Sequence, residues 1–321
     1  MRVVTLTLNP AIDYTVHADH FRVDTVNAGT EARWRAAGKG VNVAVSLAGL
    51  GVGVTATGFL GDRNPDPFEA LFRERGVEDA FVRLPGETRV NVKIVDRAAQ
   101  QTTDVDLPGL APSPAAVAEL GIRLAELVAT HEVFVLSGSL PPGVPAGIYA
   151  DLIRDLSAAG RVVALDTSGP ALATALAAVT PTILKPNVRE LEEALGRALP
   201  SEAHLLDAAL EIVRRGTELV AVSMGARGAL FVTAGEAVLA RPPGAPDAMS
   251  TVGAGDAMVA GIVAARLTGL DLPALARLAT ACSVAAITRR DGAPPARAEL
   301  DALAQRVHLS TSAPNDIPLA P

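Results

Sequence analysis

Short apolar runs alternate along the chain with longer stretches in which apolar residues recur at helical spacing. The apolar runs predict strands at 3–8, 53–59, 133–136, 162–165, 182–184 and 219–223, and a hairpin at 229–233 and 237–241. Helical spacing predicts helices at 41–50, 67–75, 115–130, 146–159, 188–195, 202–215, 254–267, 272–288 and 296–307. Such alternation is typical of βαβ units, so we expect an α/β fold with a central, mostly parallel sheet flanked by helices.

Two segments depart from this alternation, residues 14–35 and 83–106. Polar and apolar residues alternate there one by one, as in residues 89–95. One apolar and one polar face is typical of a half-covered antiparallel sheet. We therefore expect both segments to form a small β-sheet lid over the open end of the main sheet. Residues 1–310 are expected to form one domain, and 311–321, rich in Pro and Ser, a disordered tail.

Composition and charge narrow the classes of partner. The net charge of −7 argues against a nucleic-acid partner, which needs a basic surface, but allows one cationic pocket for a phosphate ester. Residues 41–61 carry no charge, yet their Gly, Thr, Ser and Asn residues favour a buried helix and strand over a membrane span. The single cysteine, Cys282, excludes an intramolecular disulfide, and we expect a reduced, cytoplasmic setting.

The segment with the clearest chemistry opens the helix predicted at 254–267. Gly253, Ala254 and Gly255 let the backbone approach an anion closely, and N–H groups at a helix start bind anions. Asp256 follows in the first turn, where a carboxylate can accept the proton of a hydroxyl that attacks phosphorus. The alternative for Asp256 is a purely structural role, because Asp is favoured in a first turn.

Two further clusters lie near the amino end of the chain. Gly38, Lys39 and Asn42 open the first long helix, where they can bind sugar hydroxyls or an anion; the alternative is a loop with a solvated lysine. Asp13 lies just past the first strand, at the end where open α/β sheets bind ligands, and can accept hydrogen bonds from a sugar. Its alternative is an Asx-Pro turn formed with Asn9.

Three further strand ends carry weaker signals. Lys185 can face nucleotide phosphate, and Asn187 and Glu190, three residues apart, can hold magnesium through water. These two residues also fit an N-capped helix with Glu at its third position. A turn containing Ser223, Gly225 and Gly228 can line a nucleotide pocket, and the Ser-Gly-Ser segment ending at Ser139 has the same standing; alone, each is only a turn.

Taken together, these clusters resemble the ribokinase-like, PfkB-type sugar kinases over residues 3 to 307. The most specific motif is Ser-Thr-Val-Gly-Ala-Gly-Asp at 250–256, supported by Ala-Gly-Lys-Gly-Val-Asn at 37–42 and Lys-Pro-Asn-x-x-Glu at 185–190. The phosphosugar branch is favoured by Asn-Pro-x-x-Asp at 9–13 and Ser-Gly-Ser-Leu-Pro at 137–141. Thr-Arg-Val-Asn-Val-Lys at 88–93 resembles members that phosphorylate fructose 1-phosphate.

The resemblance implies ATP-dependent transfer to the C6 hydroxyl of fructose 1-phosphate, with Mg²⁺, in a homodimer paired through the lid strands. Asp256 would be the base, and the backbone of Gly253, Ala254 and Gly255 the anion hole. The substrate would be bound by Asp13, Gly38, Lys39, Asn42, Arg89, Lys93 and Ser139, with Lys39, Arg89 and Lys93 on its phosphate. The nucleotide would be bound by Lys185, Asn187, Ser223, Gly225, Gly228 and Thr251, and the metal by Asn187 and Glu190.

Other functions stay open on the sequence. A tagatose-6-phosphate kinase or a 6-phosphofructokinase of the same family would place the phosphate at the other end of a similar ring. A nucleoside kinase is expected to lack Lys39 and Arg89, which are both present. A sugar-phosphate sensor without activity would not need Asp256.

Overall fold

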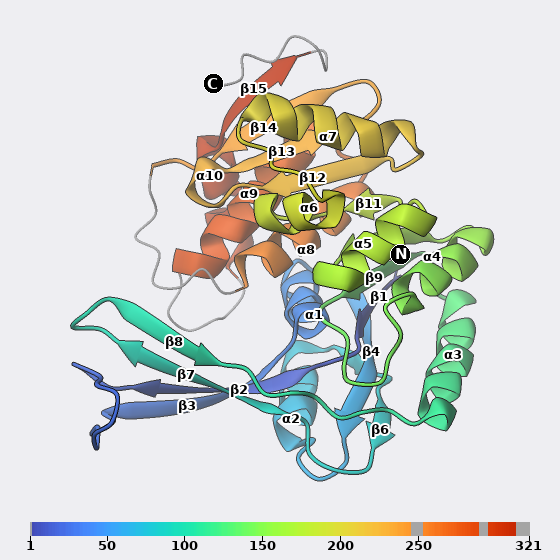
Figure 1. Cartoon of the computed structure of the whole chain (residues 1–321). Coiled ribbons are helices and arrows are strands. Elements are labelled where there is room, and N and C mark those ends of the chain that lie inside the picture. Colours follow the sequence, from blue (N-terminus) through green and yellow to red (C-terminus); the bar gives the residue numbers. More distant parts are fainter. Residues whose placement is uncertain (1, 245–252, 289–294, 313–321) are drawn as a thin grey trace.

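The computed structural model describes residues 2–244, 253–288 and 295–312, and a large sheet runs through this part of the chain (Figure 1). Its strands follow the order β15-β14-β13-β12-β11-β10-β9-β1-β4-β5, with β6 also paired to β4. Their bounds are β1 Arg2–Thr7, β4 Gly53–Gly61, β5 Glu78–Asp79, β6 Val82–Leu84, β9 Val133–Ser137, β10 Val162–Asp166, β11 Ile183–Leu184, β12 Leu219–Ser223, β13 Ala229–Val232, β14 Ala237–Arg241 and β15 His308–Ser312.

The pairing confirms the prediction of a mostly parallel sheet. Every pairing from β5 through β4, β1, β9, β10 and β11 to β12 is parallel, and β13, β14 and β15 are added antiparallel at one edge. The chain crosses from β1 to β4 on one side and to β9 on the other, so strand order reverses at β1. Ligand sites in open α/β sheets form at the carboxyl ends of the strands beside such a reversal.

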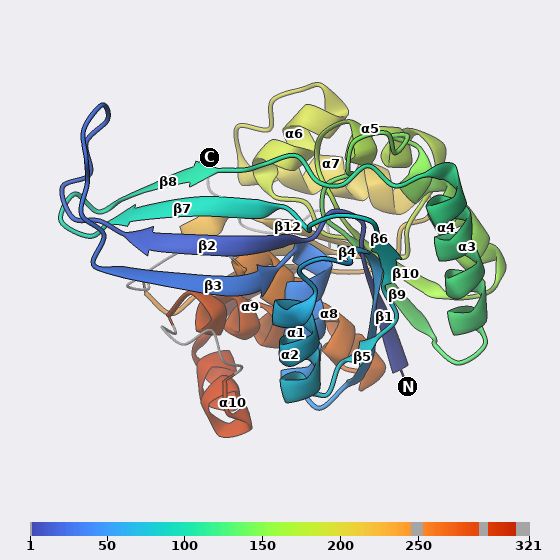
Figure 2. The ribbon, with the colours of Figure 1, turned by 90° about the horizontal axis from the view of Figure 1, so that it is seen from below.

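Helices cover both faces of the sheet (Figure 2). One layer holds α3 Pro114–Val128, α4 Ile148–Ala158, α5 Gly169–Ala178, α6 Val188–Leu195 and α7 Glu202–Arg214. The other holds α1 Lys39–Gly49, α2 Asp66–Arg75, α8 Ala254–Leu267, α9 Leu272–Thr288 and α10 Arg297–Arg306. Each layer has its own apolar core, built mainly from Leu, Val and Ala, and buried strand side chains contribute alternately to the two cores.

A separate four-stranded sheet, here called the lid, projects from the body of the molecule (Figure 1). It runs β3 Glu31–Ala37, β2 Ala11–His17, β7 Val90–Asp96 and β8 Gln101–Val105. The outer pairs are antiparallel as expected, but the central pair, β2 with β7, is parallel, so the prediction of an antiparallel lid is wrong there. The reason is topological: β2 leaves the main sheet after β1 and β7 after β6, both in the same direction.

Other differences are local. Residues 83 and 84, predicted in the lid, belong to β6 and pair with β4 of the main sheet. Thr311 and Ser312, predicted in the tail, lie in β15, which pairs with β14; residues 313–321 lie outside the described part. In residues 41–61 a helix precedes a strand as predicted, and no helix of the described residues is long and apolar enough to cross a bilayer.

Candidate active site

The predicted site residues gather where strands of the main sheet end. Asn9, Ser139, Lys185 and Ser223 follow β1, β9, β11 and β12 closely or end them, and Asp166 ends β10. These strands are parallel neighbours, so their carboxyl ends share one edge of the sheet. The lid strand β2 begins shortly after β1 ends, so the part of the lid that contains Asp13 lies beside this edge of the sheet.

Asp256 lies at the start of α8 against the start of α1. Gly253 precedes α8 with a positive φ of 83°, which glycine adopts without strain, and its carbonyl accepts from the N–H of Ala257 at 2.9 Å. Asp256 is 6% exposed, and its carboxylate Oδ2 accepts a hydrogen bond from Nδ2 of Asn42 at 2.8 Å. Asn42 therefore positions the candidate base, a contact that the sequence did not predict.

The surroundings of Asp256 make it a group that changes charge near neutral pH. Burial raises the pKa of its carboxyl to about 6, and the negative charge of Asp166 adds to this rise. The hydrogen bond from Asn42 and the charges of Lys39 and Lys185 lower the pKa but do not offset the rise. A carboxylate with a pKa near the working pH is suited to general-base catalysis.

Asp166, which the sequence analysis did not select, is the centre of the charged cluster. Its side chain is buried at the end of β10, and its Oδ1 lies 3.1 Å from Nζ of Lys39 and 3.3 Å from Nζ of Lys185. Within residues 2–244, 253–288 and 295–312, its Oδ2 has no hydrogen-bond partner. A carboxylate directly after a buried apolar run was the available signal, the same one that selected Asp13.

Ion pairing holds this cluster charged. Burial would raise the pKa of Asp166, but Lys185 and Lys39 outweigh it and lower that pKa. Burial would lower the pKa of Lys39, but Asp166, Glu190 and Asp256 outweigh it and raise that pKa. Lys185 lies against the turn at the start of α8, because a Cβ added to Gly255 would be 3.3 Å from its Nζ. Two ammonium groups therefore flank the start of α8.

Asn187 and Glu190 cap α6. The Oδ1 of Asn187 accepts from the N–H of Glu190, and Oε2 of Glu190 accepts from the N–H of Asn187, both at 2.8 Å. Oε1 of Glu190 is 3.4 Å from Nζ of Lys39, so the same carboxylate also joins the charged cluster. Asn187 and Glu190 therefore have the capping role that was the structural alternative to metal binding. If they also bind a metal, they must do so while capping α6.

The turn after β12 lies beside the start of α6. The N–H of Ser223 donates to the carbonyl of Pro186 at 3.0 Å. A Cβ added to Gly228, whose φ is 97°, would lie 2.0 Å from the carbonyl oxygen of Ala240, so only glycine fits there. The predicted nucleotide residues Ser223, Gly225 and Gly228 therefore form one compact turn next to Lys185 and Asn187. Thr251 lies outside the described residues.

The lid contributes a polar face made of side chains directly opposite one another. Asp13 pairs in register with Arg35 on β3 and with Asn91 on β7, whose Nδ2 donates to Asp13 at 3.4 Å. Nζ of Lys93 lies 3.9 Å from Asp13 and 3.1 Å from Asp104. Burial raises the pKa of Asp13, and Lys93, Asn91 and Arg35 oppose the rise. Arg35 and Asn91 join this face without having been predicted as binding residues.

Arg89 binds the backbone where the lid joins the main sheet, a region here called the hinge of the lid. Its guanidinium donates to the carbonyls of Asn9 at 3.1 Å, Pro10 at 3.3 Å and Leu107 at 2.9 Å. Nδ2 of Asn9 in turn donates to Oγ of Ser139 at 3.2 Å. The three cations predicted to share one phosphate thus divide into two groups. Arg89 and Lys93 lie around Asp13, whereas Lys39 lies with Asp166.

A buried carboxylate at a helix start, with two lysines nearby and a polar lid face beside it, is suited to transfer of a phosphoryl group to a small molecule. The model of the pfkB family carbohydrate kinases matches residues 5–299. The chain belongs to this family.

Relatives and solved structures agree with this family. The chain is 49% identical to a 1-phosphofructokinase of Rhodobacter capsulatus, with 98% of this chain and 99% of the relative covered. It is 45% identical to a 1-phosphofructokinase of Xanthomonas campestris, with 91% and 92% covered. The crystal structure of phosphofructokinase-2 from Escherichia coli in complex with substrates and products superposes with a TM-score of 0.87 at 29% identity, with 95% and 99% covered.

Proposed function

We propose that this chain is a 1-phosphofructokinase, which transfers the γ-phosphoryl group of ATP to the C6 hydroxyl of fructose 1-phosphate and yields fructose 1,6-bisphosphate and ADP. The observation that supports this chemistry best is the buried carboxylate of Asp256. It lies in the first turn of α8, where backbone N–H groups can bind an anion, and it accepts a hydrogen bond from Asn42. The names of the relatives at 49% and 45% identity support the choice of sugar phosphate.

In the reaction, the C6 oxygen attacks the γ-phosphorus, the bond from this phosphorus to the β–γ bridging oxygen breaks, and ADP leaves. Asp256 takes the proton of the hydroxyl as the new bond forms. Backbone N–H groups of Gly253, Ala254 and Gly255, with the ammonium of Lys185 beside them, stabilise charge on the transferred group. Every proton and bond is then accounted for without a further reactant.

The sugar would lie between the lid and the main sheet. The carboxylate of Asp13 would accept hydrogen bonds from its hydroxyls, and the backbone N–H at Gly38, near Asn42, would donate one to them. Its C1 phosphate would meet Arg89, Lys93 and Ser139 at the lid hinge; an Arg fork suits phosphate oxygens. Lys39 is better placed for the phosphoryl group in transfer than for the C1 phosphate, because its partners are Asp166 and Glu190.

The nucleotide would lie along Lys185, Asn187 and the turn of Ser223, Gly225 and Gly228, with Thr251 as a further expected contact. Magnesium fits the oxygen donors here, since the buried Oδ2 of Asp166 has no partner among the described residues and Glu190 is close by. The described part holds no group of three His, Cys, Asp or Glu residues suited to a metal, so phosphates and water would complete its shell. The ion would neutralise charge on the nucleotide phosphates.

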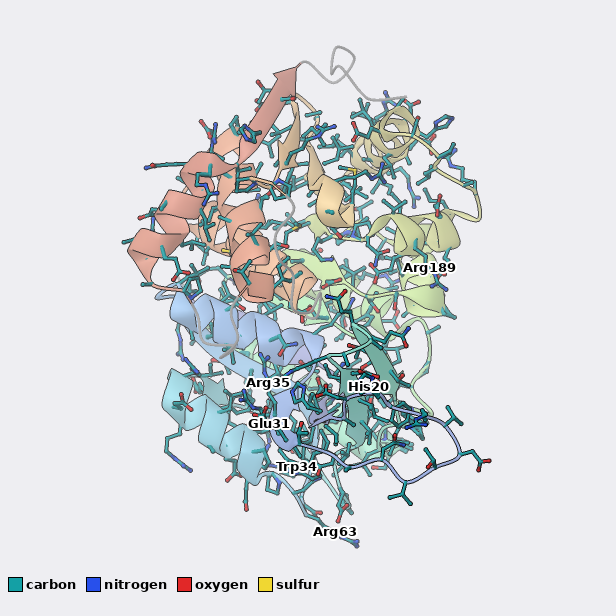
Figure 3. The ribbon with its side chains drawn as sticks, turned by 90° about the vertical axis from the view of Figure 1, so that its left-hand side faces the viewer. His20, Glu31, Trp34, Arg35, Arg63 and Arg189 are labelled. Atoms are coloured by element: carbon teal, nitrogen blue, oxygen red, sulfur yellow. The ribbon has the colours of Figure 1, made fainter. Side chains whose placement is uncertain are left out.

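A homodimer paired through the lids is part of the proposal, and the apolar face of the lid supports it. Trp34, Tyr14, Val92 and Val105 form one row across its four strands, on the face opposite Asp13. Trp34 is 60% exposed and stacks on Tyr14 with ring centroids 4.1 Å apart. Figure 3 looks at the molecule from the side on which the lid projects and labels Trp34. Burial against a second copy would remove this apolar row from water.

The direct test is release of ADP from Mg-ATP with fructose 1-phosphate, fructose 6-phosphate, tagatose 6-phosphate or fructose as acceptor. We expect turnover to be dominated by fructose 1-phosphate, and to be lost in Asp256→Asn while fructose 1-phosphate still binds. Preference for a 6-phosphate would refute the assignment of Arg89 and Lys93 to the C1 phosphate. No turnover by folded protein on all four acceptors would contradict the kinase itself.

A further inference from the structure

The ammonium of Lys39 lies between two carboxylates that belong to different elements. Lys39 is the first residue of α1, and its Nζ is 3.1 Å from Asp166 at the end of β10 and 3.4 Å from Glu190 in α6. The two carboxylates are 1% and 14% exposed, whereas the Lys39 side chain is 33% exposed. A single flexible cation therefore joins two acidic groups that are nearly withdrawn from water.

The backbone around Lys39 is fixed against β1. A Cβ on Gly40 would lie 2.3 Å from Oγ1 of Thr7, and one on Gly38 would lie 2.9 Å from Cγ2 of the same residue. The start of α1 is thus packed too tightly for any side chain on either side of Lys39. The stem of Lys39 begins from this rigid point, while its ammonium depends on its partners for its position.

The charges that face Lys39 decide what else can bind there. Asp166, Glu190 and Asp256 are the acidic groups whose charges act on it, and Lys185 is a second cation on Asp166. Paired carboxylates without a cation between them attract hard divalent ions. Lys39 already supplies the positive charge at hydrogen-bonding distance, so a divalent ion entering alone would have to displace it.

We propose that Lys39 keeps divalent metal out of the nucleotide-free site, so that metal enters only together with the phosphates of the nucleotide. The phosphates offer the ammonium another anion, and its departure frees oxygens of Asp166 and Glu190. This deepens the proposed kinase function and rests on it in one respect, that ATP is the phosphoryl donor.

The test is direct binding of Mn²⁺, measured by electron paramagnetic resonance on the full chain without nucleotide. We expect no binding by the wild type at millimolar Mn²⁺, and a site of at least about tenfold higher affinity in Lys39→Met. Lys39→Arg, which keeps the charge, should exclude the metal as the wild type does. Lys185→Met is the matched control: it removes one cation from Asp166, but leaves Lys39 between the carboxylates, and should also stay free of metal.

Three results would overturn the proposal: Mn²⁺ binding by the wild type without nucleotide, no gain in Lys39→Met, or equal gains in Lys39→Met and Lys185→Met. The first needs no variant, so the test survives a variant that does not fold. Adding Asp166→Asn to Lys39→Met should remove the gained site. The ADP-release assay on sugar phosphates is independent of this binding measurement, so failure of the proposed function and failure of this inference are distinguishable.

Discussion

Removing the amide of Asn42 should move the acid limb of the pH–rate profile toward higher pH. Asn42 donates to the carboxylate of Asp256 at 2.8 Å, and this bond favours the ionised form. With a pKa of about 6, Asp256 is active as a base above that pH, and kcat/KM should fall as the pH drops below it. Asn42→Ala leaves the carboxylate buried but without its donor, so its pKa must rise further.

The magnitude follows from the contact. A hydrogen bond to a charged group contributes about 1.5–3 kcal/mol, and its lower end corresponds to about one pKa unit. The limb should therefore move from about 6 to about 7. At pH 6 the ionised fraction would fall from about one half to about one tenth, a loss of about fivefold in kcat/KM, with almost none at pH 8 from this cause.

The assay is ADP release from fructose 1-phosphate between pH 5 and 9, with kcat/KM fitted at each pH. Asn91→Ala is the control, because Asn91 also donates to a carboxylate, that of Asp13, but not to the base. It should lower the plateau and leave the limb in place. A lowered plateau with an unmoved limb in Asn42→Ala would refute the reasoning, since Asn42 would then act on the sugar and not on Asp256.

Three other changes test separate parts of the structure. Asp256→Asn should raise the free energy of unfolding at pH 8 by up to about 3 kcal/mol. The unfolded chain ionises this carboxyl above its ordinary pKa of 3.8, whereas the fold keeps it protonated up to about 6, so the fold loses stability between these two pH values. Denaturant melts at pH 8 and below pH 4, where the difference should vanish, would check this. Trp34→Glu should convert a dimer to a monomer in light scattering, while Leu270→Glu, an exposed apolar residue outside the lid, should not. Arg89→Lys should raise the KM for fructose 1-phosphate at least about tenfold, with a smaller change in kcat. The guanidinium of Arg89 donates to three backbone carbonyls, and the single ammonium of a lysine cannot replace these bonds and also bind a phosphate. An unchanged KM in steady-state kinetics would show that Arg89 does not bind the phosphate.

Local patterns predicted most of the elements because their signals are short-range. The spans of α8, α9 and β12 agree with the predicted residues, since apolar spacing and flanking glycines set those limits. Helix α5 was not predicted, because its Ala-rich sequence has little difference between its faces. Strand β15 was also missed, since it is defined by its pairing with β14 and not by its own pattern.

The candidate site likewise has features that local sequence predicts and features that only the strand order determines. Glycines and charged residues next to strand and helix ends selected Asp256, Lys39 and Glu190 as candidates, because helix starts can be read from local sequence. Which charges share a partner depends on strand order, which brings β10 next to β11. Local patterns therefore could not show that Lys39 and Lys185 share Asp166 as a partner.

A single residue, Gly38, separates β3, an edge strand of the lid, from the helix that holds Asn42 against the candidate base. Gly38 packs against Thr7 and Pro10, so the joint has little room for independent adjustment. Strand β3, which carries Trp34 on the proposed dimer face, therefore continues through one residue into α1, whose Asn42 side chain holds the candidate base Asp256. If lids pair in solution, activity per chain becomes a function of protein concentration, and dilution alone should lower the specific activity of the enzyme.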